Sequence, residues 1–364
     1  MNQNKLAKHY KGKKVFVTGH TGFKGAWLTQ ILLQFGADVY GYSLAPNTNP
    51  NIFDTLNLEK KIKHQIGDIR DYETLNKAIK DFSPDIIFHL AAQPIVRDSY
   101  DNPKYTYEAN VMGTVNALEA IRENKIKAGV IITTDKVYKD QKTGVAYKED
   151  DPLGGYDPYS NSKACADLVV NSYIQSFFNP DEYKKSHKTL IASARAGNVI
   201  GGGDWANARL VPDAMKAFLS EESDLIIRSP KAIRPWQHVF EPLDGYLLLG
   251  MALNEGDKTK VGGWNFGPDD ADMQSVEYVI DLIIKFLGKG KCIVEEDKTK
   301  HETSILKLDS SKAKKELGWR PRYNLKKAVE ETAAWYREFY SKQSEFSIGQ
   351  INDYFDDKEG KNDK

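Results

Sequence analysis

The stretch Val15-Phe16-Val17-Thr18-Gly19-His20-Thr21-Gly22-Phe23-Lys24-Gly25 decides the fold of this chain. It opens with apolar and β-branched residues that predict a strand, and its glycines stand three residues apart, where the strand should turn into a helix. Residues without a Cβ allow the tight bend and let the backbone approach a phosphate, while the free N–H groups at the helix start offer donors and a positive dipole. Such glycines also suit a plain structural turn, but the flanking strand and helix favour a loop that binds a dinucleotide.

The first half of the chain alternates short apolar runs with longer amphipathic segments. The expected strands are Lys14–Thr18, Asp38–Ser43, Lys63–Ile66, Asp85–Leu90, Gly129–Thr133 and Thr189–Ala194. The expected helices are Gly22–Phe35, Tyr72–Phe82, Pro103–Asn124 and Pro158–Phe178. Strands separated by helices of this length form right-handed βαβ units on a parallel sheet. We therefore predict an α/β fold with a Rossmann-type doubly wound parallel sheet.

Beyond Ala194 the sequence changes to clusters of glycine, proline and tryptophan, which suit the loops of a smaller C-terminal substrate-binding lobe. With 364 residues the chain is long enough for two such units. We expect the dinucleotide-binding domain over residues 1–196, joined by about 236–266, the lobe over 197–235 and 267–340, and a C-terminal tail over 341–364 whose last residues are disordered. Further helices are expected at Ser275–Leu287, Ser310–Leu317 and Leu325–Phe339.

Charge and cysteine content narrow the class of ligand. Lys and Arg total 51 and Asp and Glu total 51, so no global field attracts nucleic acid or an anionic membrane, and we expect a small-molecule site. The two cysteines, Cys165 and Cys292, are too few for a disulfide framework and are expected to be buried, inert thiols. No apolar stretch suits a signal peptide or a membrane span, and no His or Cys pair has metal-ligand spacing. We predict a cytoplasmic protein without a structural metal.

A second group of polar residues stands around the end of the fifth expected strand and the start of the next helix. Thr133-Thr134-Asp135-Lys136 follows the strand, and Tyr159 and Lys163 lie four residues apart on one helix face. The Lys163 ammonium can lower the pKa of the Tyr159 phenol toward neutral pH, so that the phenolate accepts a proton from a substrate hydroxyl. A Tyr-x-x-x-Lys pair alone is most often a surface pair, but the dinucleotide loop and Thr134 upstream favour a catalytic one.

The glycine spacing and the motifs Gly67-Asp68-Ile69, Leu90-Ala91-Ala92-Gln93 and Asn110 resemble, in order, those of the extended short-chain dehydrogenase/reductases. The resemblance implies cofactor contacts from Gly19, His20, Gly22, Phe23, Gly25, Asp68, Ile69, Leu90, Ala91, Ala92, Asn110, Thr133, Tyr159 and Lys163. The end of the second strand, Tyr42-Ser43-Leu44, has neither an acid for the adenosine ribose nor an Arg for a 2′-phosphate. Because the missing Arg disfavours NADP, we expect NAD.

Thr134, Asp135, Tyr159 and Lys163 also match the pattern of the nucleotide-sugar 4,6-dehydratases, in which Lys136 replaces a glutamate. That lysine and Gly203-Asp204-Trp205-Ala206 resemble the branch that acts on CDP-glucose, and the resemblance spans residues 12–340. It implies that Tyr159 deprotonates the 4-hydroxyl as C4 loses hydride, that Asp135 protonates the departing 6-hydroxyl, and that hydride returns to C6. Lys136 either removes the C5 proton or only tunes the local charge. The product of this branch commonly feeds 3,6-dideoxyhexoses of bacterial surface polysaccharide.

The same resemblance suggests how substrate and a second subunit are held. The expected substrate contacts are Gln93, Thr134, Asn198, Arg209, Arg234 and His301, the arginines because their planar donors match phosphate oxygens. Arg209 also suits an exposed surface charge, and Trp205, Trp236 and Trp264 are more often packing residues than base-stacking ones. A homodimer is implied, with the helices Pro103–Asn124 and Pro158–Phe178 paired into a four-helix interface.

Two other functions compete with dehydration. A 4-epimerase or 4-reductase of a nucleoside diphosphate sugar would use Tyr159 and Lys163 but would not need an acid for elimination, so Asp135 argues against it. A dinucleotide-sensing module would have no reason to keep Thr134, Tyr159 and Lys163 together. We also expect that the His20 imidazole crowds the cofactor pyrophosphate or distorts the loop, so that NAD is held weakly.

Overall fold

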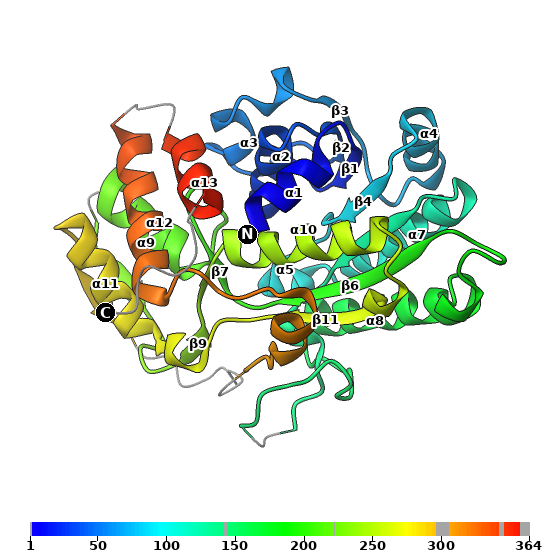
Figure 1. Ribbon diagram of the computed structural model, residues 1–364. Helices are drawn as coiled ribbons and strands as arrows, with labels where there is room; N and C mark the ends of the chain where they lie inside the picture. Colours follow the sequence, from blue (N-terminus) through cyan, green and yellow to red (C-terminus); the bar gives the residue numbers. More distant parts are fainter. Residues whose placement is uncertain (1, 142–143, 222, 296–305, 342–345, 357–364) are drawn as a thin grey trace.

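A seven-stranded parallel sheet forms the centre of the computed structural model, which describes residues 2–141, 144–221, 223–295, 306–341 and 346–356 (Figure 1). Its strand order is β11-β6-β5-β4-β1-β2-β3. The strands are β1 Lys14–Thr18, β2 Asp38–Ser43, β3 Lys63–Ile66, β4 Ile86–His89, β5 Ala128–Ile132, β6 Leu190–Ala196 and β11 Gly262–Phe266. The chain leaves β1 toward β2 and β3 and later returns on the other side of β1, so the predicted doubly wound fold is confirmed.

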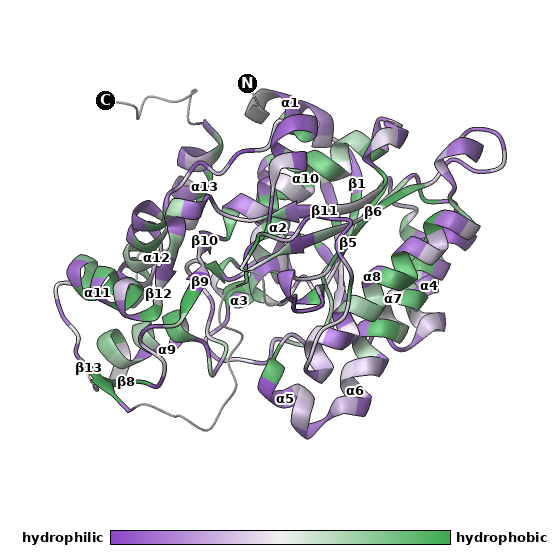
Figure 2. Ribbon diagram, turned by 90° about the horizontal axis from the view of Figure 1, so that it is seen from below, coloured by the Kyte–Doolittle hydropathy of each residue, from purple (hydrophilic) through white to green (hydrophobic). Residues whose placement is uncertain are grey.

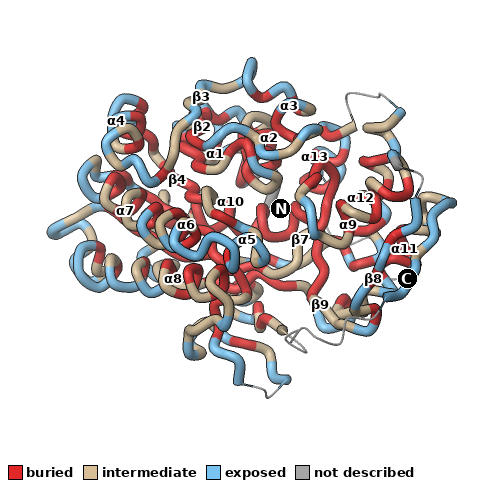
Figure 3. Tube along the Cα trace, turned by 180° about the vertical axis from the view of Figure 1, so that it is seen from behind, coloured by how far each residue is buried: buried red, intermediate tan, exposed pale blue. Residues whose placement is uncertain are grey.

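Helices cover both faces of the sheet and bury its alternating side chains (Figure 1). Val15 and Val17 belong to the core shared with α1 Asn2–Tyr10, α2 Phe23–Gln34 and α10 Phe240–Asn254. Phe16 points to the opposite core, shared with α4 Tyr72–Phe82, α7 Gly113–Glu123 and α8 Pro158–Ser176. Because successive strand residues face opposite sides, one short apolar strand supplies both cores. Figure 3 shows this burial along the central strands and α10.

The remaining elements build the loops above the sheet and the C-terminal lobe. Those of the first half are α3 Ile52–Thr55, η1 Leu58–Lys60, α5 Val96–Asp101, α6 Pro103–Tyr107, η2 Glu108–Met112, η3 Asp135–Val137 and η4 Pro180–Glu182. Those of the second half are β7 Val199–Ile200, α9 Leu210–Lys216, η5 Ala217–Glu221, β8 Leu225–Ile227, β9 Ile233–Pro235, β10 Gln237–His238, η6 Lys258–Lys260, η7 Asp270–Asp272, β12 Met273–Ser275, α11 Val276–Leu287, β13 Cys292–Val294, η8 Ala313–Leu317, α12 Leu325–Tyr340 and α13 Phe346–Asp356. Helices α9, α11 and α12 pack together beside the sheet domain (Figure 2).

The prediction that residues 341–364 form a tail is wrong for residues 346–356. These residues form α13, and Ile351, Tyr354 and Phe355 are buried because their spacing puts them on one helix face. The predicted disorder concerns residues 357–364, which lie outside the described residues.

The prediction that both cysteines are buried is also wrong. Cys165 and Cys292 are partly exposed free thiols, because Cys165 faces Asn161 on the outer side of α8 and Cys292 starts the short strand β13. Within the described part of the chain, no helix is both long and apolar enough to cross a membrane.

Candidate active site

The glycine loop between β1 and α2 is fixed by close backbone contacts. Gly19 has φ +78°, and a Cβ added there would lie 2.7 Å from the Ala91 amide nitrogen. A Cβ on Gly25 would lie 2.0 Å from the Gly19 carbonyl oxygen. Both positions therefore require glycine, and the loop after β1 rests directly on the loop after β4.

This loop fits the pyrophosphate of a dinucleotide. It lies between β1 and β4, where the strand order reverses and where doubly wound sheets bind their ligands. Gly22 caps α2, is exposed, and has no side-chain hydrogen bond to the helix, so the first N–H groups stay available for an anion. These features of the backbone, and not the glycine pattern alone, support a cofactor site.

Other predicted cofactor residues surround the same loop. Leu90, Ala91 and Ala92 are half-buried after β4, and the Ala91 amide donates to the Thr18 hydroxyl at 3.2 Å. Ile69 is buried against Gly113. The Asp68 carboxylate accepts Arg70 Nη2 at 2.7 Å, and these hydrogen bonds lower the pKa of Asp68.

His20 lies beneath the loop, where it cannot contact a ligand directly. Its ring is fully buried and packs edge-on against Phe53, with His64 beside it. It also fills the space where Gly41 of β2 lacks a Cβ. Neither ring nitrogen has a hydrogen-bond partner among the described residues, and burial lowers the pKa of His20 to about 4. Direct crowding of the pyrophosphate is thus not what the structure shows, and any influence on the cofactor passes through the loop backbone.

The catalytic turn, defined here as Thr134–Val137, follows β5 and carries three of the predicted residues. Thr134 caps η3, and its hydroxyl donates to Asp135 Oδ1 at 3.0 Å. Lys136 Nζ lies 3.6 Å from the same carboxylate oxygen. Asp135 is 1% exposed, whereas the Lys136 side chain is 38% exposed.

Tyr159 and Lys163 face this turn from the start of α8. Asp157 caps the helix through the Ser160 amide, which fixes where α8 begins. Lys163 is buried and its Nζ donates to the Ile132 carbonyl at 3.1 Å. Burial and the nearby Lys24 lower the pKa of Lys163 to about 7.

Burial raises the pKa of Tyr159 above its usual value, while Lys136 and a hydrogen bond with Thr134 oppose that rise. Lys136, rather than the predicted Lys163, is thus the cation with the strongest influence on this phenol. The reason is geometric, since Lys163 holds the Ile132 carbonyl while Lys136 projects from the opposing turn. Arg209 also lowers the pKa of Tyr159, and Asp135 raises it.

Lys24 belongs to the same group of charges, although sequence reasoning did not single it out. It stands in the first turn of α2, and burial together with Arg209 lowers its pKa to about 8. Its charge also acts on Asp135, Lys136 and Lys163. The sequence feature that could have indicated Lys24 is a cation inside the glycine loop. With Lys24 included, the site carries more positive charge than the predicted residues alone supply.

Asn110 and Gln93 shape the wall of the site. Asn110 lies in the π-helical turn η2, where its amide donates to the Gln93 carbonyl at 3.1 Å and to Ser162 Oγ at 2.9 Å. The Gln93 side chain donates to the Ile95 carbonyl and to Thr106 Oγ1, and it accepts from the Ile95 amide. These internal bonds favour a role for Gln93 in shaping the loop over direct contact with substrate.

The predicted substrate residues of the lobe lie at different depths. Asn198 is half-buried after β6, and its carbonyl accepts the Gln237 amide at 3.1 Å. Arg209 donates to Asp204 Oδ2 at 2.8 Å while its charge reaches Tyr159. Arg234 is half-buried in β9, and its Nη1 donates to the Ile233 carbonyl. His301 lies outside the described residues.

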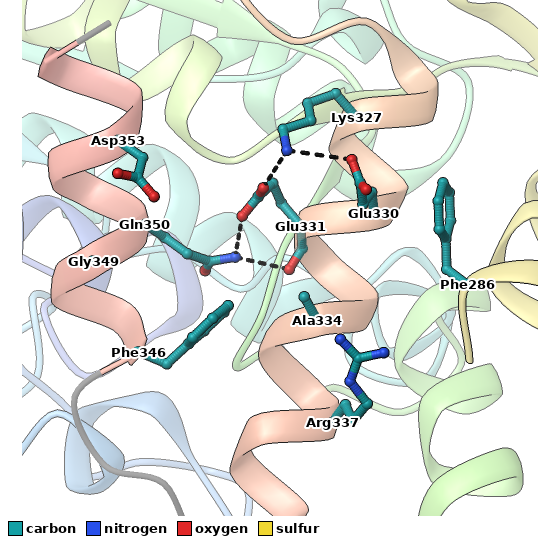
Figure 4. Close-up of a pocket in the computed structure, with 10 residues that line it drawn as sticks. All are labelled: Phe286, Lys327, Glu330, Glu331, Ala334, Arg337, Phe346, Gly349, Gln350 and Asp353. Carbon is teal, nitrogen blue, oxygen red and sulfur yellow. Dashed lines mark hydrogen bonds and ion pairs between the residues drawn. The ribbon is translucent and has the colours of Figure 1, made fainter. Parts of the chain in front are cut away.

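A separate pocket of about 390 Å³ lies between α12 and α13 (Figure 4). Its wall includes Lys327, Glu331 and Gln350, which bond to one another, and none of the predicted site residues. The pocket therefore belongs to the packing of α13 and not to the catalytic turn.

A doubly wound sheet with a glycine loop at its reversal point, and a Tyr–Lys pair facing the end of β5, define an enzyme of the short-chain dehydrogenase/reductase class. The model of the family described as GDP-mannose 4,6 dehydratase matches residues 16–332. The chain belongs to this family of nucleotide-sugar dehydratases.

Relatives and solved structures agree with that assignment. The CDP-glucose 4,6-dehydratase of Salmonella typhimurium is 48% identical over 331 residues, which cover 90% of this chain and 91% of that protein. The dTDP-glucose 4,6-dehydratase of Bacillus anthracis in complex with NAD has a TM-score of 0.74 at 24% identity and covers 90% of this chain and 97% of its own. The UDP-glucose 4-epimerase of Thermus thermophilus in complex with NAD has a TM-score of 0.75 at 23% identity, with coverages of 89% and 99%. At these identities the two structures support the fold.

Proposed function

We propose that the protein is an NAD-dependent hydro-lyase that converts CDP-glucose to CDP-4-keto-6-deoxyglucose. The observation that carries this proposal is the catalytic turn, which sets Asp135 and Lys136 opposite Tyr159 and Lys163. An epimerase or reductase needs the Tyr–Lys pair but not an acid and a base beside it. Cytidine as the base is supported by the relative that is 48% identical.

The residues divide the reaction between them. Bound NAD supplies a hydride acceptor at C4 and the hydride donor for C6. Tyr159 takes the proton of the 4-hydroxyl, and Thr134 donates a hydrogen bond to the 4-oxygen. In its neutral form Lys136 removes the C5 proton, which the neighbouring 4-ketone has made acidic, and Asp135 gives a proton to the 6-hydroxyl as it leaves. As hydride reaches C6, Lys136 returns the proton to C5, and the proton held by Tyr159 replaces the one that Asp135 gave up, so that the atoms balance with the release of one water molecule.

Arginines around the cleft suit the pyrophosphate of the substrate. Arg209 already lies within the electrostatic reach of Tyr159, and Arg234 stands on the short strand β9 of the lobe. Together with Asn198 they would orient the nucleotide so that the hexose reaches the catalytic turn. The free thiols and the nucleotide-sugar substrate suit the cytoplasm, and the product suits a supply of deoxysugars for surface polysaccharide.

Mass spectrometry of the products tests this proposal. The protein is incubated with NAD and, separately, with CDP-glucose, UDP-glucose and dTDP-glucose, and with Tyr159→Phe as the inactive control. We expect loss of the mass of one water molecule, fastest from CDP-glucose. Unchanged mass with inverted C4 stereochemistry would assign an epimerase, and no change with any sugar would contradict an enzymatic role on these sugars.

We also propose a homodimer through the helices after β4 and β5. Tyr107, Met112, Leu168 and Phe177 are exposed large apolar residues on this part of the chain, and several such residues on neighbouring helices suit an interface. Tyr107 and Met112 stand on α6 and η2, and Leu168 stands on α8, so both predicted interface helices contribute. A second copy of the same face would cover them by two-fold symmetry.

A further inference from the structure

A fully buried ion pair lies directly behind the catalytic turn. Asp167 stands on α8 one turn beyond Lys163 and is 3% exposed. Its carboxylate accepts Thr133 Oγ1 at 2.7 Å, Ser193 Oγ at 2.5 Å, and Arg195 Nε and Nη2 at 3.1 and 3.0 Å. Every one of these donors comes from the end of β5 or from β6, so Asp167 ties α8 to both strands.

Arg195 also contacts Tyr138, which follows the other end of the turn. Its Nη1 donates to the Tyr138 hydroxyl at 2.7 Å and to the Glu149 carbonyl at 2.9 Å. The Tyr138 hydroxyl in turn donates to Asn265 Oδ1 of β11 at 2.7 Å. Arg195 also lies over the face of the Tyr138 ring, 5.1 Å from its centroid.

Thr133 and Tyr138 are the residues immediately before and after the catalytic turn. We propose that the Asp167–Arg195 pair is a positioning device that anchors both ends of this turn, through Thr133 and Tyr138, and so holds Asp135 and Lys136 against Tyr159. The inference rests on the proposed function, because positioning has meaning only for the elimination those residues carry out.

Stability alone is a poor explanation for the pair. Well-packed apolar residues can often replace a buried ion pair without loss of stability, because burial costs each charge its hydration. Four directional hydrogen bonds to one carboxylate fix the orientation of the backbone segments that carry the donors, which apolar packing does not do. The two residues held in this way, Thr133 and Tyr138, determine where the turn lies.

The two halves of the reaction should depend on the pair unequally. Tyr159 and Lys163 are built into α8 itself, and Lys163 is tied to β5 by its own bond to Ile132. Asp135 and Lys136 lie on the turn, which meets α8 through the hydrogen bond between Thr134 and Tyr159 and is held at its two ends by Thr133 and Tyr138. A loosened anchor therefore harms loss of water more than oxidation at C4. Because small misplacements of reacting groups cost up to ~10²-fold in rate, the effect should be measurable.

Three conservative variants separate positioning from stability. Thr133→Val and Tyr138→Phe each release one anchor without leaving a lone buried charge. Ser193→Ala is the matched control, because it removes a hydrogen bond to the same carboxylate from β6 and does not touch the turn. Thermal unfolding, kcat and KM for CDP-glucose, and the absorbance of enzyme-bound NADH during turnover are measured for each.

We expect Thr133→Val and Tyr138→Phe to lower kcat by roughly 10- to 100-fold with KM nearly unchanged, and to raise the steady-state fraction of bound NADH. Ser193→Ala should lose stability but keep the wild-type NADH fraction. If all three variants lose only stability and share the wild-type NADH fraction, the pair is structural and the proposal is overturned.

A readout without substrate keeps this proposal separable from the proposed function. Lys136 is the cation that most lowers the pKa of Tyr159, so a displaced turn should raise that pKa further. NMR titration of ¹³Cζ-labelled tyrosine, with Tyr159 assigned through Tyr159→Phe, should show an upward shift in Thr133→Val and none in Ser193→Ala. Equal midpoints in both would reject positioning even in an enzyme that dehydrates CDP-glucose. If the wild type dehydrates no sugar but Thr133→Val still raises the pKa of Tyr159 relative to wild type, the proposed function is rejected and the anchoring is kept.

Discussion

Tyr159 is the residue whose loss should affect the proposed reaction most directly. Its phenol is the only proton acceptor proposed for the 4-hydroxyl, and its ring is buried at the start of α8, within hydrogen-bond reach of Thr134. We expect Tyr159→Phe to keep the fold and to lower kcat by at least ~10²-fold, the usual scale for acid–base catalysis. Steady-state kinetics with CDP-glucose, checked against an unchanged melting temperature, measure it. Turnover within a few-fold of wild type would remove Tyr159 from the mechanism.

Asp135→Asn should produce a more selective defect. The amide keeps the shape of the carboxyl, which packs tightly against Gly197, but cannot give a proton to the 6-hydroxyl. Oxidation at C4 should survive, so NADH absorbance should appear on addition of CDP-glucose while release of water stops. Should no NADH build up while deuterium exchange at C5 stays normal, the acid is another group.

His20→Gly tests how the buried imidazole acts on the loop. Removing a ring that packs on Phe53 and fills the space above Gly41 should cost stability, by about 2–4 kcal/mol for a side chain of this size. The loop can then relax onto the pyrophosphate, so we expect tighter NAD binding in calorimetry of cofactor-stripped protein. Equal or weaker affinity would mean that His20 does not limit binding.

The site residues that belong to short sequence motifs could be predicted, and those that depend on contacts between distant segments could not. Tyr159 and Lys163 could be paired because four residues make one helical turn, and Asp135 because it follows a strand. For Lys24 the only signal was its place inside the glycine loop, and its approach to Lys163 could not be predicted because it depends on how α2 sits on the sheet. The influence of Lys136 on Tyr159 likewise depends on two elements meeting in space.

At the scale of elements, α13 is held by a buried carboxylate on α10. Glu241 is fully buried, and it accepts the Tyr354 hydroxyl of α13 at 2.8 Å and the amides of Arg322 and Tyr323 at 3.0 and 2.8 Å. Burial outweighs these donors and raises the pKa of Glu241 to about 8. The folded protein therefore keeps a proton here that the unfolded chain gives up near its ordinary pKa of about 4.5.

This proton predicts a pH dependence with a definite sign. A folded pKa above the unfolded one contributes stability that is complete below about pH 4.5 and is lost as pH rises to about 8. Relative to Glu241→Gln, the wild type should lose up to about 1.4 kcal/mol of unfolding free energy per pH unit across this window. Urea unfolding at several pH values measures the difference. Glu331→Gln, which also touches α13 (Figure 4), is the control and should keep the wild-type slope.

Elements with strong apolar periodicity were predicted well, and those defined by tertiary contacts were not. Tyr72–Phe82 and Asp38–Ser43 have the predicted bounds. The helix expected over Pro103–Asn124 instead contains the π-helical turn Glu108–Met112, which lets Asn110 reach Gln93. Helix α13 was not predicted because its few apolar residues become buried only through tertiary contacts with residues such as Phe35 and Phe240, which the local sequence does not reveal.

At the scale of the whole molecule, the homodimer is the main untested consequence. Leu168 is 54% exposed on α8, and Ile226 is 53% exposed on β8, away from the proposed interface. We expect Leu168→Glu to shift the protein toward monomers in light scattering, because a buried unpaired carboxylate opposes association. Ile226→Glu is the matched control and should leave the dimer intact. A monomeric wild type at micromolar concentration would refute the interface.

The contacts of α13 with the core can form only late in synthesis, because α13 lies near the end of the chain. Phe35 packs against Phe355, and Phe240 packs against Tyr354. Both of these rings are therefore synthesised well before the residues that cover them. At roughly 5–20 residues per second, a ribosome needs on the order of tens of seconds to travel from the first of these residues to the last. Until α13 is made, the faces of these two rings that it covers have no partner from α13. The core is therefore complete only once α13 has been made, and a chain truncated before α13 would leave uncovered the faces of Phe35 and Phe240 that pack on Phe355 and Tyr354.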